Sequence, residues 1–350
     1  MLVVRLPNRA YNSYKSASMK KKVLVTREVF DDTLEYLGQH FEVTSNQANV
    51  PYSPQQMTAR LQGMDAAVIT TSDRVDEDLL ARCPSLKAVC SVSVGFNHID
   101  LEACTRHGVM ATNTPGVLTE SVADMAVCLT LATVRRLTEG ERLVRARAWE
   151  GTHLKQLLGH DLHHATVGIC GLGRIGQTIA RRLRGFDTKL VYTDLVRADV
   201  QVEAALGAAY LSKDELLRTA DIVILILPYT PQTHYYIGQA ELEKMQRSAV
   251  LINIARGSIV DDTALARALK ERRIWAAGLD VYENEPKVNP ALFELDNVVL
   301  SPHIASATEP TRQAMAMLAA RNCVAALAGE VPPNLLNPEA RKNAQAGGRA

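Results

Sequence analysis

Residues 166–176 read TVGICGLGRIG, a short apolar run that leads into three closely spaced glycines. The helix-like run QTIARRLRG follows, so the pattern predicts a strand, a tight turn and a helix that begins at the turn. In such a unit Gly171 permits the turn, Gly173 lets the backbone approach a pyrophosphate, and Gly176 lets the helix pack on the strand. The helix N-terminus offers amide groups and a positive dipole to phosphates. The stretch therefore predicts a dinucleotide-binding unit near the middle of the 350-residue chain.

The next apolar run, KLVYT, ends at Asp194, 18 residues after Gly176. A carboxylate at the end of this strand accepts hydrogen bonds from the ribose hydroxyls and repels a 2′-phosphate. Asp194 therefore favours NAD(H), while the nearby Arg197 keeps NADP(H) possible. The alternative interpretation is a glycine turn followed by a helix-capping aspartate, with no bound nucleotide.

Two series of apolar runs alternate with amphipathic segments along the chain. Such alternation predicts parallel strands joined by crossover helices, and the length of the chain suits two domains. The expected fold class is therefore α/β, with two doubly wound parallel-sheet lobes that are Rossmann-like or flavodoxin-like. The expected strands of the first lobe are 22–26, 66–70, 86–92 and 108–112, with helices at 53–62 and 76–82. Those of the second lobe are 166–170, 189–193, 221–228, 249–255, 275–281 and 297–303.

Two longer helical patterns flank the second series. Residues 119–147 are expected to form one long helix, with a capping box of Ser121 and Asp124 at its start. A helix of that length is too long for one small lobe, so it is expected to pack against a partner subunit. Residues 309–329 are expected to form an amphipathic helix that returns to the first lobe.

Overall composition narrows the classes of function. The chain is 47% hydrophobic and 22% charged with a net charge of +1, which gives no general attraction to nucleic acid or anionic membranes. No run approaches the roughly 20 apolar residues of a transmembrane helix. Six scattered cysteines without metal-binding spacing predict buried, reduced thiols and a cytoplasmic location. The expected partners include neither nucleic acid nor a membrane, and no metal is expected.

The two ends of the chain differ from the rest in composition. Residues 1–18 are basic, rich in hydroxyl groups and free of acidic residues, which predicts a disordered extension and leaves a transit peptide as the alternative. The Pro-, Asn- and Gly-rich segment 336–350 is expected to be a disordered tail.

Three chemically distinctive residues follow expected strands of the second lobe: Arg256, Glu285 and His303. The carboxyl ends of such strands face the ligand crevice, so the three side chains are expected to meet there. A guanidinium binds a carboxylate through two hydrogen bonds, and an imidazole oriented by a carboxylate transfers a proton near neutral pH. This set suits reduction of a 2-oxo acid by NADH. Taken singly, each residue has a simpler interpretation, as a surface ion pair, a turn residue or a loop histidine.

The runs GLGRIG, NIARGSIVD, GLDVYENEP and SPHIASAT together resemble the D-isomer-specific 2-hydroxyacid dehydrogenase family, over residues 22–337. TPGVLTESVAD and DLHHATVGICGLGRIG are most similar to its glyoxylate, hydroxypyruvate and 2-ketogluconate reductases. The resemblance implies a homodimer formed through helix 119–147 and a dinucleotide lobe inserted into a discontinuous substrate lobe. The implied domains are 19–115 with 306–335 for the substrate and 116–305 for the dinucleotide.

The resemblance also implies roles for individual residues. Arg256 would bind the substrate, His303 would be the general acid, and Glu285 would be the partner of His303. In SVSVGFNHID the backbone amides of Val94 and Gly95 would hold the substrate carboxylate. The residues predicted to bind the cofactor are Gly171, Leu172, Gly173, Arg174, Ile175, Gly176, Asp194, Leu227, Pro228, Thr233, Ile254, Ala255, Arg256, Asp280, His303 and Ala305, with Asp280 near the nicotinamide carboxamide.

Two departures from related enzymes narrow the branch, and one alternative on the same scaffold stays open. Phosphite dehydrogenases carry a lysine where this chain has Val94, and formate dehydrogenases carry a glutamine where it has Glu285. Some relatives are NAD(H)-sensing corepressors that barely turn over, and the fold by itself does not separate them from reductases. The expected function is therefore NAD(H)-dependent reduction of a small 2-oxo acid to the D-2-hydroxy acid, with a corepressor-like sensor as the alternative.

Overall fold

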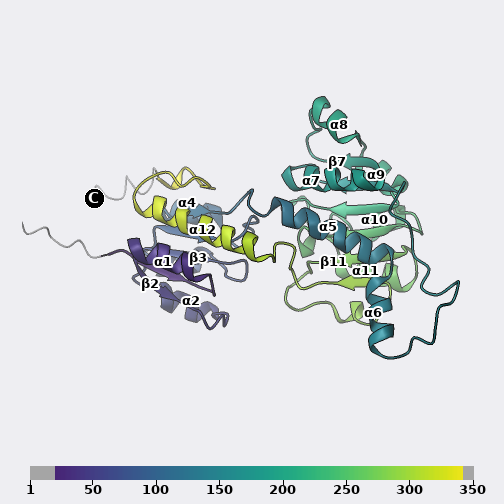
Figure 1. Cartoon of the computed structure of the whole chain (residues 1–350). Coiled ribbons are helices and arrows are strands. Elements are labelled where there is room, and N and C mark those ends of the chain that lie inside the picture. Colours follow the sequence, from purple (N-terminus) through teal and green to yellow (C-terminus); the bar gives the residue numbers. More distant parts are fainter. Residues whose placement is uncertain (1–19, 342–350) are drawn as a thin grey trace, which may run out of the picture.

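The computed structural model describes residues 20–341, which form two α/β lobes that lie side by side (Figure 1). The first lobe is built on a five-stranded sheet in the order β2-β1-β3-β4-β5, and the second on a seven-stranded sheet in the order β12-β11-β10-β9-β6-β7-β8. All strand pairs in both sheets are parallel. The predicted fold class is confirmed. The predicted extension 1–18 lies outside the described residues.

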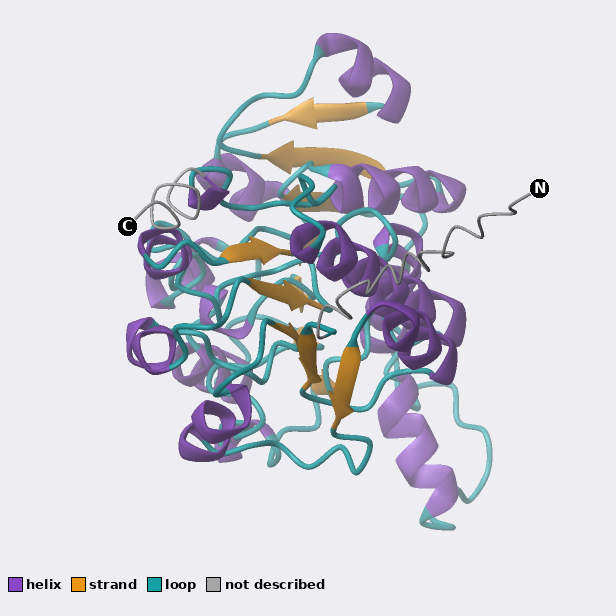
Figure 2. Cartoon of the chain, turned by 90° about the vertical axis from the view of Figure 1, so that its left-hand side faces the viewer, coloured by secondary structure: helices purple, strands orange, loops and turns teal. Residues whose placement is uncertain are grey.

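The first lobe alternates strands and helices in the flavodoxin-like order. Its elements are β1 (Lys22–Val25), α1 (Asp31–His40), β2 (Glu42–Ser45), α2 (Pro54–Leu61), β3 (Ala66–Ile69), α3 (Glu77–Arg82), β4 (Ala88–Ser91), α4 (Leu101–Arg106) and β5 (Met110–Thr112). Strands β1, β3, β4 and β5 are almost fully buried, because helices cover both faces of the sheet. Figure 2 shows helices on both sides of the strands.

The second lobe has the Rossmann strand order with one added strand. Its strands are β6 (Thr166–Cys170), β7 (Lys189–Thr193), β8 (Ala208–Tyr210), β9 (Ile222–Leu225), β10 (Val250–Asn253), β11 (Ala276–Leu279) and β12 (Val298–Leu300). Its helices are α5 (Thr119–Val134), α6 (Leu137–Arg145), α7 (Arg174–Leu183), α8 (Val200–Leu206), α9 (Lys213–Thr219), α10 (Gln239–Lys244) and α11 (Asp262–Lys270), with short 3₁₀ turns η1 (Arg184–Phe186), η2 (Gly257–Ile259) and η3 (Pro290–Leu292).

Two strands, β2 and β8, were not predicted from the sequence. Both lie at an edge of their sheet, and most of their residues are exposed or half-buried. Their sequences, EVTS and AAY, therefore lack the continuous apolar run by which the buried strands were recognised. The predicted strands exist, but most are one to three residues shorter than predicted.

The predicted single helix at 119–147 is wrong in two respects. Arg136 adopts a left-handed conformation with φ of 52°, and this residue separates α5 from α6. The capping box is also absent: Leu118 is the N-cap, and the Asp124 carboxylate accepts a hydrogen bond from Arg182 instead. The first half of the segment is therefore a core helix of its own lobe, whereas α6 has no buried residue.

Helix α5 packs tightly against the seven-stranded sheet, with Leu129 and Ala126 in the core of the second lobe. A side chain at Gly278 of β11 would lie 2.5 Å from the Thr133 hydroxyl and 2.9 Å from Leu129. Gly278 thus permits the close approach of helix and sheet. Helix α5 therefore belongs to the core of its own lobe, and the expectation that segment 119–147 packs on a partner subunit stays a prediction.

After the second lobe, α12 (Glu309–Leu327) carries the chain back and packs on the first sheet. Its residues Ala319, Ala320 and Cys323 are fully buried against that sheet. In Figure 1 this helix, in yellow, lies beside α1 and β3, elements from the opposite end of the sequence. The first lobe is therefore built from both ends of the chain.

Part of the predicted disordered tail is ordered. The Leu336 amide donates to the Ala111 carbonyl, and the buried Asn337 side chain bonds to the backbone of Ala111 and Val109. These backbone bonds next to β5 give an ordered segment that the composition alone did not suggest. Residues 342–350 lie outside the described part of the chain.

The described residues also bear on compartment and metal binding. All six cysteines are free thiols; five are buried, and Cys128 is exposed, contrary to the expectation of burial. Between residues 20 and 341 no helix is long and apolar enough to cross a membrane. In the same range no three His, Cys, Asp or Glu side chains are grouped so as to hold a metal ion.

Candidate active site

The glycine turn after β6 lies where the sheet order reverses, between β6 and β9. Gly171 has φ of +100°, and a Cβ there would lie 2.9 Å from the Ile226 carbonyl. A Cβ on Gly176 would overlap the Gly171 carbonyl, whereas one on Gly173 would meet nothing within 4 Å. Gly173 is therefore the open position, and it is the N-cap of α7, where amide groups and the helix dipole favour a phosphate. This cradle fits the pyrophosphate of a dinucleotide.

Asp194 follows β7 and lies against the glycine turn. One carboxylate oxygen accepts a hydrogen bond of 2.7 Å from the Leu172 amide and the other accepts one from Leu195. Each oxygen keeps a second lone pair for a ribose hydroxyl. Arg197 is the residue whose presence in the sequence kept NADP(H) possible as the cofactor. Its guanidinium forms two hydrogen bonds to the Glu203 carboxylate, of 2.8 and 2.9 Å.

The other residues predicted to contact the cofactor lie in loops at the carboxyl ends of neighbouring strands. Leu227 and Pro228 follow β9, and the Thr233 hydroxyl donates to the Pro228 carbonyl, which ties this loop together. Ile254 and Ala255 follow β10. The remaining predicted positions are Arg174 and Ile175 in the first turn of α7 and Ala305 after β12.

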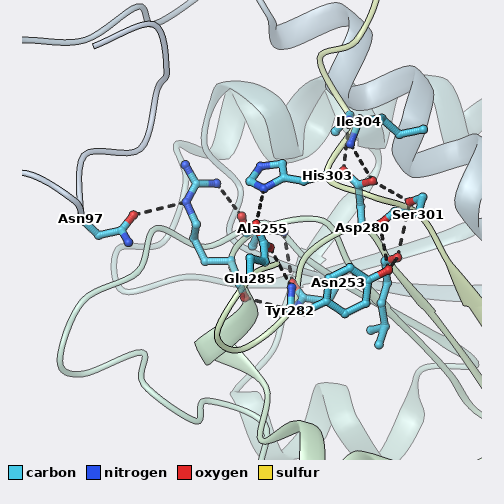
Figure 3. Close-up of polar contacts among 12 residues, drawn as sticks. Asn97, Asn253, Ala255, Asp280, Tyr282, Glu285, Ser301, His303 and Ile304 are labelled. Carbon is cyan, nitrogen blue, oxygen red and sulfur yellow. Dashed lines mark hydrogen bonds and ion pairs between the residues drawn. The ribbon is translucent and has the colours of Figure 1, made fainter. Parts of the chain in front are cut away.

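His303 and Glu285 form a hydrogen-bonded pair beyond the ends of β12 and β11 (Figure 3). His303 Nδ1 lies 2.7 Å from Glu285 Oε2, and both side chains are about one-third exposed, at 35% and 32%. The second Glu285 oxygen accepts a 2.8 Å hydrogen bond from the Tyr282 amide. Two donors therefore fix the carboxylate, and the carboxylate orients the imidazole so that Nε2 is left for another partner.

The environment of Glu285 keeps it ionised. Burial raises the pKa of Glu285, but the hydrogen bond and charge of His303, the Tyr282 amide and the charge of Arg256 outweigh it, and the net pKa is lower than usual. An ionised carboxylate accepts from Nδ1–H and so determines which imidazole nitrogen holds that proton.

Asp280 holds the segment that carries His303. Its carboxylate, fully buried, accepts hydrogen bonds from the Ser301 hydroxyl and from the amides of Ile304 and Ala305, at 2.6 to 2.9 Å (Figure 3). These bonds stabilise the left-handed conformation of His303, with φ of 52°, which non-glycine residues rarely adopt. The predicted contact of Asp280 with the nicotinamide stays a prediction, whereas its role in shaping this turn is visible.

Arg256 spans the boundary between the lobes. It follows β10 of the second lobe, and its Nε lies 3.4 Å from the Asn97 amide oxygen in the loop after β4 of the first lobe (Figure 3). A Cβ on Gly95 would overlap the guanidinium, so only glycine allows this approach. Burial lowers the pKa of Arg256 and the charge of Glu285 raises it, and a guanidinium stays charged at neutral pH. The Val94 and Gly95 amides have no hydrogen-bond partner within residues 20–341.

The site thus places a cation, an imidazole and a carboxylate near one another, at the same edge of the sheet as a cradle for a dinucleotide. The structure brings Arg256, Glu285 and His303 together, as the sequence predicted, and places the loop of Val94 and Gly95 beside Arg256, as the family resemblance implied. Asn97 was not identified from the sequence. The only feature of the sequence that could have indicated a role for Asn97 is its position two residues after Gly95, in a loop at the carboxyl end of a strand.

Comparison with known proteins assigns this architecture to a class. Residues 127–305 match the family model "D-isomer specific 2-hydroxyacid dehydrogenase, NAD binding domain". The chain belongs to the D-isomer specific 2-hydroxyacid dehydrogenases, which makes it an oxidoreductase that acts on CH–OH groups and uses a nicotinamide dinucleotide.

The similar proteins within that class include named glyoxylate reductases. The chain is 45% identical over 325 residues to the glyoxylate reductase of Thermococcus onnurineus, which covers 92% of this chain and 97% of that protein. It is 44% identical to the glyoxylate reductase of Pyrococcus furiosus, over 93% of this chain and 97% of that one. Among solved structures, an NADPH-dependent glyoxylate/hydroxypyruvate reductase from Sinorhizobium meliloti, in complex with NADP and malonate, superposes with a TM-score of 0.82 at 34% identity, covering 92% of this chain and 98% of that one.

Proposed function

We propose that this chain reduces a small 2-oxo acid of the glyoxylate, hydroxypyruvate or 2-ketogluconate type to the corresponding 2-hydroxy acid, of D configuration where a stereocentre forms. The observation that carries the proposal is the 2.7 Å pair of His303 and Glu285, with the charge of Arg256 close enough to lower the pKa of Glu285. The glyoxylate reductases similar to this chain support the choice of substrate class.

Substrate binding is assigned to both lobes. Arg256 would bind the carboxylate and the carbonyl oxygen of the 2-oxo acid, since a guanidinium presents parallel N–H groups to such a pair of oxygens. The amides of Val94 and Gly95, which have no hydrogen-bond partner among the described residues, would donate to the other side of the carboxylate. Because these groups come from different lobes, the bound acid would bridge them and hold the cleft closed.

Proton transfer is assigned to His303. With Nδ1–H donated to Glu285, the protonated imidazole would give its Nε2 proton to the carbonyl oxygen as that oxygen becomes a hydroxyl. The imidazole is then neutral, and Glu285 keeps its hydrogen bond to Nδ1 throughout. Bound NADH supplies the hydride to the carbonyl carbon, so one hydride and one proton account for the new CH–OH group.

The preferred cofactor is proposed to be NADH. Asp194 lies where the ribose hydroxyls of the adenosine half would bind, and its negative charge opposes a 2′-phosphate. The one arginine of the following loop, Arg197, is engaged by Glu203. The exposed apolar side chains of Leu195 and Val196, 92% and 79% exposed, offer a surface for the adenine ring.

A homodimer is proposed through α6 and the loop that follows it. This segment exposes Leu137, Val144, Trp149, Leu154 and Leu158, each more than half exposed. Large apolar side chains gathered in one segment are typical of a protein–protein interface. A cytoplasmic location is proposed from the six unpaired thiols.

The direct test is the consumption of NADH by the purified chain with glyoxylate, hydroxypyruvate and 2-ketogluconate, followed by absorbance. We expect turnover above about 1 s⁻¹ with at least one of them. The same series with NADPH tests the proposed cofactor preference. Slower turnover with every 2-oxo acid and both cofactors, despite tight NADH binding, would contradict the reductase and favour a sensor.

A further inference from the structure

The loop after β4, which carries Val94 and Gly95, is fixed by a chain of side-chain hydrogen bonds. His98 Nε2 lies 3.0 Å from Ser91 Oγ, Ser91 Oγ lies 2.7 Å from Ser93 Oγ, and Ser93 Oγ lies 2.7 Å from the Gly95 carbonyl oxygen. Ser91 and Ser93 are 0% and 5% exposed, so water has little access to these hydroxyls. The chain therefore connects His98 to the residue that touches Arg256.

The direction of these bonds follows from their last acceptor. A carbonyl oxygen only accepts hydrogen bonds, so the Ser93 hydroxyl donates its one proton to the Gly95 carbonyl oxygen. Ser93 must then accept from Ser91, and Ser91, having used its proton, must accept from His98. His98 is therefore protonated on Nε2 in its neutral form.

The other nitrogen of His98 agrees with this assignment. Nδ1 is buried and has no hydrogen-bond partner within residues 20–341, as expected for an unprotonated nitrogen, whereas a buried N–H without an acceptor would be costly. Burial and the nearby charge of Arg256 lower the pKa of His98 to about 4. The imidazole is therefore neutral at physiological pH.

Gly95 is held on both of its peptide bonds. The Asn113 side chain donates to the Val94 carbonyl at 2.8 Å, and Ser93 donates to the Gly95 carbonyl. In a planar trans peptide the C=O and the next N–H point in opposite directions. Asn113 therefore directs the Gly95 amide, and the chain from His98 fixes the following peptide and with it the shape of the loop.

We propose that His98 is a positioning residue for substrate carboxylate binding, in which its Nε2–H, relayed through Ser91 and Ser93, holds Gly95 against Arg256. This inference rests on the proposed function, because it assigns the loop to the carboxylate of the 2-oxo acid. His98 itself touches no reacting atom. Its effect is therefore on KM for the 2-oxo acid and not on the chemical step.

The first test compares two replacements of His98. His98→Gln keeps an N–H near the position of Nε2, whereas His98→Leu fills a similar volume without a donor. We expect His98→Leu to raise KM for glyoxylate roughly tenfold, as for loss of one buried hydrogen bond. We expect kcat and the Kd for NADH to change less than about threefold, and His98→Gln to restore most of the KM. Equal KM values for His98→Leu and the wild type would overturn the proposal, as would a kcat that falls while KM does not.

A double-mutant cycle tests the relay itself. Ser93→Ala removes its last donor, so His98→Leu should add little further increase in KM in the Ser93→Ala background. Independent effects, with the two increases multiplying, would show that His98 acts by packing alone. Ser93→Ala also keeps the proposal testable if His98→Leu fails to fold.

The imidazole tautomer gives a readout that does not depend on activity. In protein labelled with ¹⁵N-histidine, His98 should show a protonated Nε2 and an unprotonated Nδ1 at neutral pH. The opposite tautomer would overturn the relay whether or not the enzyme turns over glyoxylate. A wild-type chain with the expected tautomer but without turnover of any 2-oxo acid would instead overturn the proposed function.

Discussion

Asp194 is the residue whose contacts decide most about the cofactor. Its carboxylate is held by the Leu172 and Leu195 amides at the edge of the glycine turn, so its position does not depend on a flexible side chain. Arg197, the arginine of the loop that follows Asp194, is bound to Glu203. The fixed negative charge of Asp194 and the engaged positive charge of Arg197 both support the proposed preference for NADH.

Replacing Asp194 by alanine should weaken the preference for NADH. The variant loses two acceptors for the ribose hydroxyls and the repulsion of a 2′-phosphate, so we expect KM for NADH to rise roughly tenfold while that for NADPH falls. The kcat for glyoxylate should change little, because Asp194 is remote from the reacting atoms. Steady-state kinetics with both cofactors measure this, with the exposed Asp161→Ala as the matched control. An unchanged ratio of the two KM values would contradict the assignment.

His98 should make the protein sensitive to acid. Its folded pKa is about 4, below the ordinary value of 6.5. The unfolded chain therefore binds a proton that the folded chain does not, and stability is complete above about pH 6.5 and falls as the pH drops toward 4. His98→Gln has no such proton to take up, so its free energy of unfolding should fall less between pH 7 and pH 5. Urea unfolding at both pH values tests this, and equal losses in the two proteins would refute it.

Single residues were predictable where they follow a recognised strand. Arg256, Asp280 and His303 all follow buried apolar strands, and the strand pattern alone predicts that they lie at one edge of the sheet. Asn97 and the bonds of His98 were not predictable, because they depend on the conformation of a loop without periodicity. The full engagement of Asp280 by its own turn was not predicted for the same reason.

At the scale of elements, the buried parts of the fold were the predictable ones. Strands β9 and β10 are covered on both faces, and their sequences are continuous apolar runs. The edge strands β2 and β8 lack such runs. The break between α5 and α6 falls at Arg136, where neither glycine nor proline marks a helix end. The Arg136 side chain forms two hydrogen bonds to the Glu139 carboxylate, of 2.7 and 2.9 Å, which are consistent with its left-handed backbone. No local sequence pattern predicts these bonds.

Helix α6 is the main element of the proposed dimer interface. It has no buried residue in the chain by itself, yet Leu137 and Val144 are apolar and 63% and 58% exposed. If they lie in a dimer interface, Val144→Glu should convert dimers to single chains, because a buried unpaired carboxylate is strongly unfavourable. Light scattering measures the mass in solution.

The matched control is Val331→Glu, at a valine that is equally exposed, 59%, but lies outside this segment. The control should leave the dimer intact. A wild-type chain that is a monomer at micromolar concentration, or a Val144→Glu variant that stays dimeric, would contradict the proposed interface.

At the scale of the whole molecule, the lobes meet through groups that act on one ligand. Arg256 comes from the second lobe, its partner Asn97 from the first, and α12 joins the two as it returns to the first sheet. The two α/β series could be predicted from the alternation of strands and helices. The return of helix 309–329 to the first lobe was predicted from the sequence, and the family resemblance implied in addition that this segment belongs to the substrate domain.

The central claim is that His303, oriented by Glu285, protonates the carbonyl oxygen while the dinucleotide is bound beside it. The most direct measurement is the rate of NADH oxidation in a single turnover, after glyoxylate is mixed with the NADH complex of His303→Ala. The surface variant His163→Ala is the control, and NADH binding is measured separately for each. We predict that His303→Ala binds NADH normally and loses about 10²- to 10⁴-fold in rate, the usual contribution of a general acid. A rate within about threefold of the wild type would contradict the account.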